Sequence, residues 1–378
     1  MMEFTQYRPS WAEVNLDCIQ YNIRQIKEEL NIPSKIMAVI KANAYGHGAV
    51  KVAEEALESG AEALAVALLE EAIELRNEGV EAPILVLGKV LPEFSPVAAK
   101  ENIMLTVFQK DWLEEAEQHM SKSEESCLYI HLELGTGMNR TGILTEEDLQ
   151  ACLEALKKSK CIYLTGAYTH FATADEEDSA YYMQQLDRFK NLAAVFETIW
   201  PDPVAWHMSN SAATIHFPKN TADYIRYGVS MYGLYPSPYL AKVQPVQLKQ
   251  AFSLHSRLVE VKRVQPGETI SYGRTYTAEH AEWIGTVPIG YADGWLRKLQ
   301  GADVLIAGKR MPIVGRICMD QFMVRLDQEY SVGELVTLIG KQGEEEITMQ
   351  ETADLLDTIV YEVPCTISAR IPRVYSKS

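Results

Sequence analysis

Apolar and polar residues follow a strand-then-helix rhythm over the first two thirds of the chain. Short apolar runs bounded by turn residues alternate with stretches in which apolar residues recur every three or four positions. The first pattern is typical of strands buried on both faces, and the second of amphipathic helices. The expected strands are residues 36–40, 63–67, 84–87, 103–107, 128–132, 164–169, 205–208 and 224–226.

Strands that alternate with helices predict a parallel sheet, and eight such units favour a closed (β/α)8 barrel over an open sheet. The first helix is expected to take Asp17 as its N-cap and to bury Ile19, Ile23 and Ile26. The longest helix is expected over residues 178–196. In a barrel of this kind, the carboxyl ends of all strands surround one pocket.

The pattern becomes rich in strands after the prolines at positions 236, 238 and 245. A long strand is expected over residues 252–264, then shorter ones at 283–289, 304–306, 311–314, 322–326 and 335–339, with a hairpin turn at residues 307–309. Thr348 and Glu351 form a capping box ahead of one helix. The fold class is therefore α/β, with an N-terminal (β/α)8 barrel (residues 12–245) and a C-terminal mostly-β domain (246–378) that residues 1–11 are expected to join.

Composition narrows the function classes. The chain has 378 residues, more than one hydrophobic core usually serves. Its net charge of −17 argues against nucleic acid or an anionic membrane as the main partner. It contains neither an apolar run of about 20 residues nor a secretory signal pattern. The six cysteines are scattered without paired or metal-ligand spacing, so we expect a reduced, cytoplasmic protein without a metal site.

Residues that can carry chemistry follow the expected strand ends repeatedly. Each also has an ordinary interpretation: a lysine reaching into water, a core histidine, a helix N-cap, or an arginine in a structural ion pair. On one barrel face, however, all of them surround the same pocket, which favours a functional site. The residues are Lys41, Glu133, Arg140, His170, Asn210, Ser211 and Arg226.

The last two strand ends suggest a phosphate site. Loops after the seventh and eighth strands of such barrels commonly bind phosphate through helix amino termini, and Asn210, Ser211, Gly228 and Val229 offer a hydroxyl and backbone N–H groups. A lysine amine on the same face suggests an aldehyde-bearing phosphorylated cofactor. Pyridoxal 5'-phosphate fits, because its chemistry needs a lysine, a phosphate anchor and a partner for the ring nitrogen.

These residues lie in motifs through which the whole chain resembles the alanine racemases. The motifs keep the family's order and spacing. They are AVIKANAYGHG at residues 38–48, TGMNR at 136–140, THFA at 169–172, NSAA at 210–213, RYG at 226–228, SYG at 271–273, GYADG at 290–294, GRICMD at 315–320 and YE at 361–362.

The resemblance implies a head-to-tail homodimer that interconverts L-alanine and D-alanine by a two-base mechanism on a pyridoxal 5'-phosphate aldimine, supplying D-alanine for peptidoglycan. Lys41 then holds the cofactor and takes the α-proton of D-alanine, while Tyr272 of the partner subunit takes that of L-alanine. Two bases on opposite faces are what a racemase needs, because a single base tends to return the proton to the face it left.

The resemblance also assigns roles to further residues. Arg226 bonds the pyridine nitrogen, and His170 contacts both Arg226 and the tyrosine. Arg140 bonds the cofactor's phenolic oxygen and, with the Met319 N–H of the partner subunit, the substrate carboxylate. The expected phosphate ligands are Tyr45, Asn210, Ser211, Gly228, Val229 and Tyr361, and the residues expected to shape the substrate entrance are Tyr291, Cys318 and Asp320.

Two positions depart from the family pattern. Glu133 stands where many relatives have a lysine that is often carbamylated, so we expect its carboxylate to orient Arg140 without bicarbonate. Gly135 stands where an aspartate is usual, which leaves the rigidity of this loop open.

Three alternatives remain at this point. Serine or broader amino-acid racemase activity stays open, because a small pocket discriminates weakly against one hydroxyl. A non-catalytic pyridoxal-phosphate carrier would lack the second domain and Tyr272. A barrel-type decarboxylase would place an acidic residue where this chain has Arg226.

Overall fold

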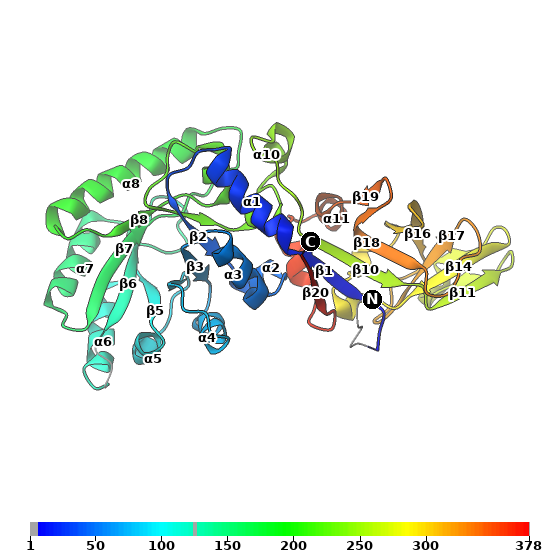
Figure 1. Cartoon of the computed structure of the whole chain (residues 1–378), viewed down its shortest axis with the longest axis horizontal. Coiled ribbons are helices and arrows are strands. Elements are labelled where there is room, and N and C mark those ends of the chain that lie inside the picture. The colour runs from blue at the N-terminus through cyan, green and yellow to red at the C-terminus, as the bar shows by residue number, and fades with distance from the viewer. Residues whose placement is uncertain (1–6, 124–126, 378) are drawn as a thin grey trace. The chain divides into compact units, whose positions relative to one another are not determined.

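The computed structural model describes residues 7–123 and 127–377, and the chain divides into two compact units (Figure 1). The barrel unit comprises Cys18–Ala44 and Ala49–Lys249. The β-rich unit comprises the segment ending at Asp17, the short segment Tyr45–Gly48 and the residues from Gln250 onward.

The barrel unit contains the closed parallel barrel that the strand–helix alternation predicts. Its strands are β2 (Lys35–Val39), β3 (Ala63–Val66), β4 (Ile84–Val86), β5 (Ile103–Val107), β6 (Leu128–Glu133), β7 (Ile162–Tyr168), β8 (Ala205–His207) and β9 (Tyr224–Tyr227). The ring closes between β2 and β9, where Lys35 pairs with Tyr224. β3 and β4 are entirely buried, as expected of parallel strands covered on both faces.

Helices connect these strands. They are α1 (Leu16–Glu28), α3 (Ala49–Glu58), α4 (Leu69–Asn77), α5 (Ser95–Lys100), α6 (Lys110–Met120), α7 (Glu146–Lys158), α8 (Ala180–Ile199), α9 (Ser211–His216) and α10 (Pro238–Val243), with short 3-10 turns η1 (Pro92–Phe94) and η2 (Val229–Tyr232). In α7, the Thr145 hydroxyl accepts a hydrogen bond from the Asp148 N–H at 3.1 Å. Leu149, Leu153 and Leu156 are buried on one face, so this helix follows from capping and periodicity alone.

The β-rich unit is built on one large sheet in the order β11-β14-β17-β16-β15-β18-β10-β1-β20, with β19 paired to β18. The strands of the large sheet are β1 (Trp11–Asn15), β10 (Phe252–Arg257), β11 (Glu260–Val264), β14 (Glu282–Val287), β15 (Asp303–Ile306), β16 (Lys309–Val314), β17 (Phe322–Leu326), β18 (Leu335–Gln342), β19 (Glu345–Ile347) and β20 (Arg373–Ser376). β12 (Thr269–Ile270) and β13 (Tyr276–Thr277) form a separate two-stranded sheet. The helical segments are η3 (Tyr272–Arg274), η4 (Tyr291–Asp293), η5 (Arg297–Leu299), α11 (Met349–Leu356) and α12 (Glu362–Thr366).

Two local predictions were right and two were wrong. The hairpin turn is confirmed, with Ile306 paired to Lys309. Thr348 is confirmed as the N-cap of α11, its hydroxyl accepting from the Glu351 N–H at 3.0 Å, while the Glu351 carboxylate accepts from Arg310 at 2.6 Å. The single long strand over residues 252–264 was wrong, because β10 and β11 are separate and pair with different neighbours. The N-cap prediction for Asp17 was also wrong: α1 begins at Leu16, which leaves Asp17 inside its first turn.

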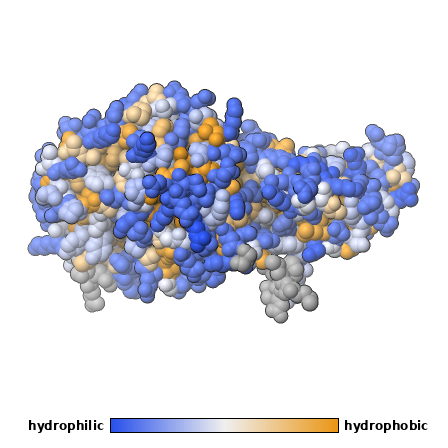
Figure 2. All heavy atoms as spheres, turned by 45° about the horizontal axis from the view of Figure 1, so that its top comes forward, coloured by the Kyte–Doolittle hydropathy of each residue, from blue (hydrophilic) through white to orange (hydrophobic). Residues whose placement is uncertain are grey.

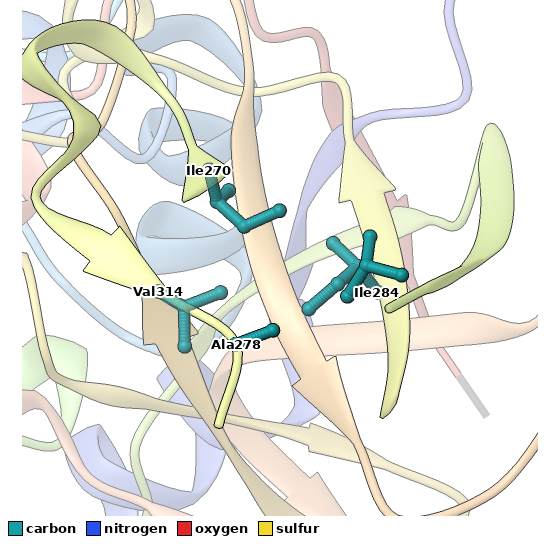
Figure 3. Packing of buried hydrophobic residues seen from close by; sticks show 5 residues of the cluster. Ile270, Ala278, Ile284 and Val314 are labelled. Carbon is teal, nitrogen blue, oxygen red and sulfur yellow. The ribbon is translucent and has the colours of Figure 1, made fainter. Parts of the chain in front are cut away.

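A small hydrophobic cluster of the β-rich unit includes residues on both sides of the segment 271–277 (Figure 3). It contains Val264, Ile270, Ala278, Ile284 and Val314, all buried. The face shown in Figure 2 is mainly hydrophilic, with scattered groups of apolar residues. Within residues 7–123 and 127–377, no helix combines the length and apolar character that crossing a bilayer requires.

Candidate active site

Lys41 opens an unusual turn directly after β2. Residues Ala42, Asn43 and Ala44 all have φ between 52° and 53° and ψ near 50°, which is the left-handed helical region. This conformation costs roughly 1–2 kcal/mol for each non-glycine residue, and such strain concentrates at functional sites. The Glu71 carboxylate holds the turn by accepting from the Ala42 N–H at 2.6 Å.

Arg226 belongs to β9 and is only 3% exposed. Its guanidinium donates to the Thr169 carbonyl at 2.7 Å, to Nδ1 of His207 at 2.8 Å and to Nδ1 of His170 at 3.1 Å. The Tyr168 ring lies 4.9 Å from its central carbon. Burial lowers the pKa of Arg226 to about 10, so it stays protonated near neutral pH.

Three histidines around Arg226 are held neutral. Burial, followed by the positive charge of Arg226, lowers the pKa of His131 to about 3 and that of His207 well below its usual value. The pKa of His170 is also lowered well below its usual value, by burial and then by the charges of Arg226, Arg140 and Lys41.

The charges of three expected site residues act on His170. Lys41 follows β2, Arg140 lies in the loop after β6 and Arg226 belongs to β9, yet all three cations act on the same ring. The hydrogen bond of 3.1 Å between Arg226 and His170 brings a residue of β9 into contact with the residue that follows β7 by two positions. The resulting cluster of positive charge at the barrel rim suits an anionic ligand.

Glu133 is the buried carboxyl group of this cluster, 5% exposed at the end of β6. Burial raises the pKa of its carboxyl, while a hydrogen bond with Thr141 and the charges of Arg140 and Arg226 oppose the rise. Its Oε2 has no hydrogen-bond partner among the residues that the structure describes. Glu133 thus acts on Arg140 through its charge, without a hydrogen-bonded ion pair between the two in the described chain.

The loop that carries Arg140 is fixed by its backbone. The Gly135 N–H donates to the Ile143 carbonyl at 2.7 Å, and the Ile143 N–H donates to the Glu133 carbonyl at 2.8 Å. A Cβ at Gly135 would lie 2.6 Å from the Leu144 side chain. Leu144 therefore fills the space that a side chain at position 135 would need, and these hydrogen bonds order the loop despite the glycine.

The predicted phosphate loops lie against each other. Asn210 caps α9, its side-chain oxygen accepting from the Ala213 N–H at 2.9 Å. The Ser211 hydroxyl accepts from the Gly228 N–H at 2.8 Å, and η2 begins at Val229 immediately after it. Two helical amino termini and a buried hydroxyl therefore converge, which is a chemical environment suited to a phosphate.

The remaining expected residues belong to the β-rich unit. The rings of Tyr45 and Tyr361 lie 6.2 Å apart there. Tyr272, 72% exposed, lines a pocket of about 450 Å³ with the expected residues Tyr291, Cys318, Met319 and Asp320. Ser271 before it has a φ of 68° and donates its hydroxyl to the Arg316 carbonyl at 2.7 Å, which fixes the exposed tyrosine's backbone.

Sequence reasoning missed three kinds of residue here. His207, which accepts from Arg226, lies at a strand end and could have been found by the same rule as His170. Arg297 and Arg316 also line the Tyr272 pocket and were not among the expected site residues. The left-handed turn at residues 42–44 carries no sequence signal, because alanine does not favour positive φ.

Comparison with known proteins decides the family. The sequence-family model of the alanine racemase N-terminal domain matches residues 14–236. The family model of the alanine racemase C-terminal domain matches residues 251–375. The chain belongs to the alanine racemase family. It is an enzyme, an amino-acid racemase of the isomerase class.

The most similar curated relatives include an alanine racemase of Geobacillus stearothermophilus, 52% identical over 98% of this chain and 94% of its own. Alanine racemase 1 of Bacillus subtilis is 50% identical over 98% of this chain and 93% of its own. Among solved structures, alanine racemase from Bacillus anthracis with bound L-Ala-P superposes with a TM-score of 0.95 at 46% identity, covering 98% of this chain and 96% of that one. A histidine racemase from Leuconostoc mesenteroides superposes with a TM-score of 0.90 at 29% identity, covering 99% of both chains.

Proposed function

We propose that this racemase interconverts L-alanine and D-alanine with pyridoxal 5'-phosphate as its cofactor. The proposal rests on the hydrogen bond of 3.1 Å from Arg226 to His170 at the barrel rim, together with the charges of Lys41 and Arg140, which act on the same ring. Bound at this rim, the cofactor would supply an aldehyde for the substrate's amino group and an electron-withdrawing ring that acidifies the α-hydrogen.

The side chains at the rim fit such a group. Lys41 offers the amine, and the Ser211–Gly228 contact brings a hydroxyl and two helical amino termini to the phosphate. Arg226 would donate to the ring nitrogen, and Arg140 to the phenolic oxygen. Because Arg226 keeps its proton, the ring nitrogen of a bound cofactor would stay unprotonated, which would weaken electron withdrawal and favour proton exchange over side reactions.

The proposed mechanism uses two bases from two chains of a homodimer. The Lys41 amine exchanges the α-proton on one face of the substrate, and the hydroxyl of Tyr272 of the partner subunit exchanges it on the other. The high exposure of Tyr272 supports this role, because the side chain is accessible to a second chain. His170 is a neutral ring that already accepts a hydrogen bond from Arg226. In this mechanism it would also contact the tyrosine.

Substrate binding would also use residues from both chains of the homodimer. The carboxylate of alanine would be held by Arg140 and by the Met319 N–H of the partner subunit. Tyr291, Cys318 and Asp320 would shape the entrance, and Asn210, Val229, Tyr45 and Tyr361 would complete the phosphate site. Such an enzyme would act in the cytoplasm and supply D-alanine for peptidoglycan.

Substrate choice is the direct test. Purified enzyme loaded with cofactor is incubated with L-alanine, L-serine, L-glutamate or L-histidine, and both enantiomers are measured by chiral chromatography. Histidine is included because a histidine racemase shares this fold. We expect racemisation to be fastest with alanine and weaker with serine. The proposal would be contradicted if the enzyme showed neither cofactor absorbance nor racemisation. It would also be contradicted if histidine were racemised faster than alanine.

A further inference from the structure

Two loops of the β-rich unit form the edge of the Tyr272 pocket, residues 290–294 and 315–320. Their backbones are in direct contact: the Tyr291 N–H donates to the Cys318 carbonyl at 3.1 Å, and the Ala292 N–H donates to the Met319 carbonyl at 3.0 Å. A Cβ at Gly290 would lie only 2.3 Å from the Met319 carbonyl oxygen. The place of the Met319 peptide therefore depends on the 290–294 turn.

Asp293 anchors that turn from within. Its side chain is fully buried, and its carboxylate accepts two hydrogen bonds from Arg8, at 2.8 and 3.0 Å. It also accepts from the Gly290 N–H at 3.0 Å, and Nε of Arg370 lies 3.4 Å from Oδ1. A buried carboxylate with two guanidinium partners and a backbone donor is strongly fixed in place, and removing one of its partners is costly.

Arg370 extends this anchor to the pocket itself. Its Nη2 donates to Oδ1 of Asp320 at 2.7 Å, although the Asp320 side chain is 54% exposed. One guanidinium thus joins a carboxylate with no exposure to one that lines the pocket. Arg8 also donates to the Arg370 carbonyl at 3.2 Å, so the amino-terminal segment takes part in the same network.

We propose that Asp293 is a positioning residue for substrate binding. Together with Arg8 and Arg370, it sets the position of the Met319 N–H through the 290–294 turn and that of the Asp320 carboxylate through Arg370. The inference rests on the proposed function, in which the Met319 N–H binds the substrate carboxylate. Asp293 itself touches neither substrate nor cofactor in this account.

The test uses Asp293→Asn, which removes the charge and nearly keeps the shape. The control is Arg310→Met, which breaks a 2.6 Å ion pair with Glu351 elsewhere in the same unit. In the cofactor-loaded enzyme, KM and kcat for alanine, the inhibition constant of propionate and the melting temperature are measured. Propionate keeps the carboxylate of alanine but lacks its amine, so it reports on carboxylate binding.

We expect Asp293→Asn to raise both the KM for alanine and the inhibition constant of propionate about tenfold, the scale of one charged hydrogen bond. Cofactor absorbance should not change, and Arg310→Met should change neither binding constant. A lower melting temperature with both constants unchanged would show a structural role only and overturn the inference.

A second pair of variants covers the case in which Asp293→Asn does not fold. Arg370→Met removes the link to Asp320 but leaves Arg8 on Asp293, and Arg370→Lys restores a cation. Weaker propionate binding in the first, partly recovered in the second, supports the inference, whereas wild-type binding in both overturns it. Failure of the wild-type enzyme to load cofactor and racemise alanine would instead refute the proposed function.

Discussion

Arg226 and His207 are joined by a hydrogen bond of 2.8 Å between the guanidinium and Nδ1 of the imidazole. Because arginine can only donate, His207 must accept at Nδ1 and carry its proton on Nε2. That nitrogen lies 2.8 Å from Nδ1 of His131, which must accept in turn. One cation thus fixes the tautomers of two neutral rings in the barrel core.

Replacing His207 by phenylalanine should leave a buried Arg226 N–H without its acceptor. The free energy of unfolding of the barrel unit should fall by about 2 kcal/mol, and the absorbance of the bound cofactor should shift because Arg226 is free to reorient. Urea unfolding and a visible spectrum measure the two effects. Wild-type stability with an unshifted spectrum would show that His207 does not position Arg226.

The buried histidines predict acid sensitivity. The pKa of His131 falls from 6.5 in the unfolded chain to about 3, so below pH 6.5 the folded state binds fewer protons than the unfolded one. The stability from this group is therefore fully present above pH 6.5 and is lost as the pH falls toward 3. His170 and His207 are shifted in the same direction.

Urea unfolding at several pH values between 7.5 and 5 measures this loss. His131→Gln should reduce the slope of stability against pH below 6.5 by roughly 1 kcal/mol per pH unit, because one proton-binding difference is removed. A slope equal to that of the wild type would contradict the neutral assignment of His131.

Glu133 predicts that activity needs no bicarbonate. Its carboxylate is already part of the chain and acts on Arg140 by charge. Initial rates in carbon dioxide-free buffer should therefore not change when bicarbonate is added, and Glu133→Gln should raise the KM for alanine several-fold by removing that charge. If bicarbonate activated the wild-type enzyme, the interpretation that the Glu133 carboxylate makes bicarbonate unnecessary would be wrong.

Thiol reactivity should differ sharply among the cysteines. Burial raises the pKa of Cys152 to about 12 and that of Cys161 to about 11, so neither forms an appreciable thiolate at pH 7.5. Cys365 is exposed. Brief treatment with iodoacetamide followed by peptide mass spectrometry should find label on Cys365 and none on the other two. Equal labelling of all three would contradict the burial of Cys152 and Cys161.

Much of the barrel was predictable because its parallel strands are covered on both faces and their apolar runs stand out, as in β3 and β4. The break between Arg257 and Glu260 was not, since a strand can change its neighbours without any change in residue pattern. β1 was likewise missed: its pairing with β10 and β20 joins residues more than 230 positions apart.

The functional site, too, was only partly predictable from the residue pattern. Strand-end positions pointed to Lys41, His170 and Arg226, because a barrel brings such ends to one rim. The bond from Arg226 to His207 and the burial of Asp293 depend on which side chains meet across strands and loops, and local pattern carries no record of that.

The central claim is that each active site takes Lys41 from one chain and Tyr272 from the other. Lys41→Ala and Tyr272→Phe proteins, each inactive alone, are mixed under conditions in which subunit exchange is demonstrated with tagged chains. Random exchange makes half the dimers mixed, each with one intact site, so alanine racemisation should recover to about a quarter of the wild-type rate. No recovery despite demonstrated exchange would contradict a shared site.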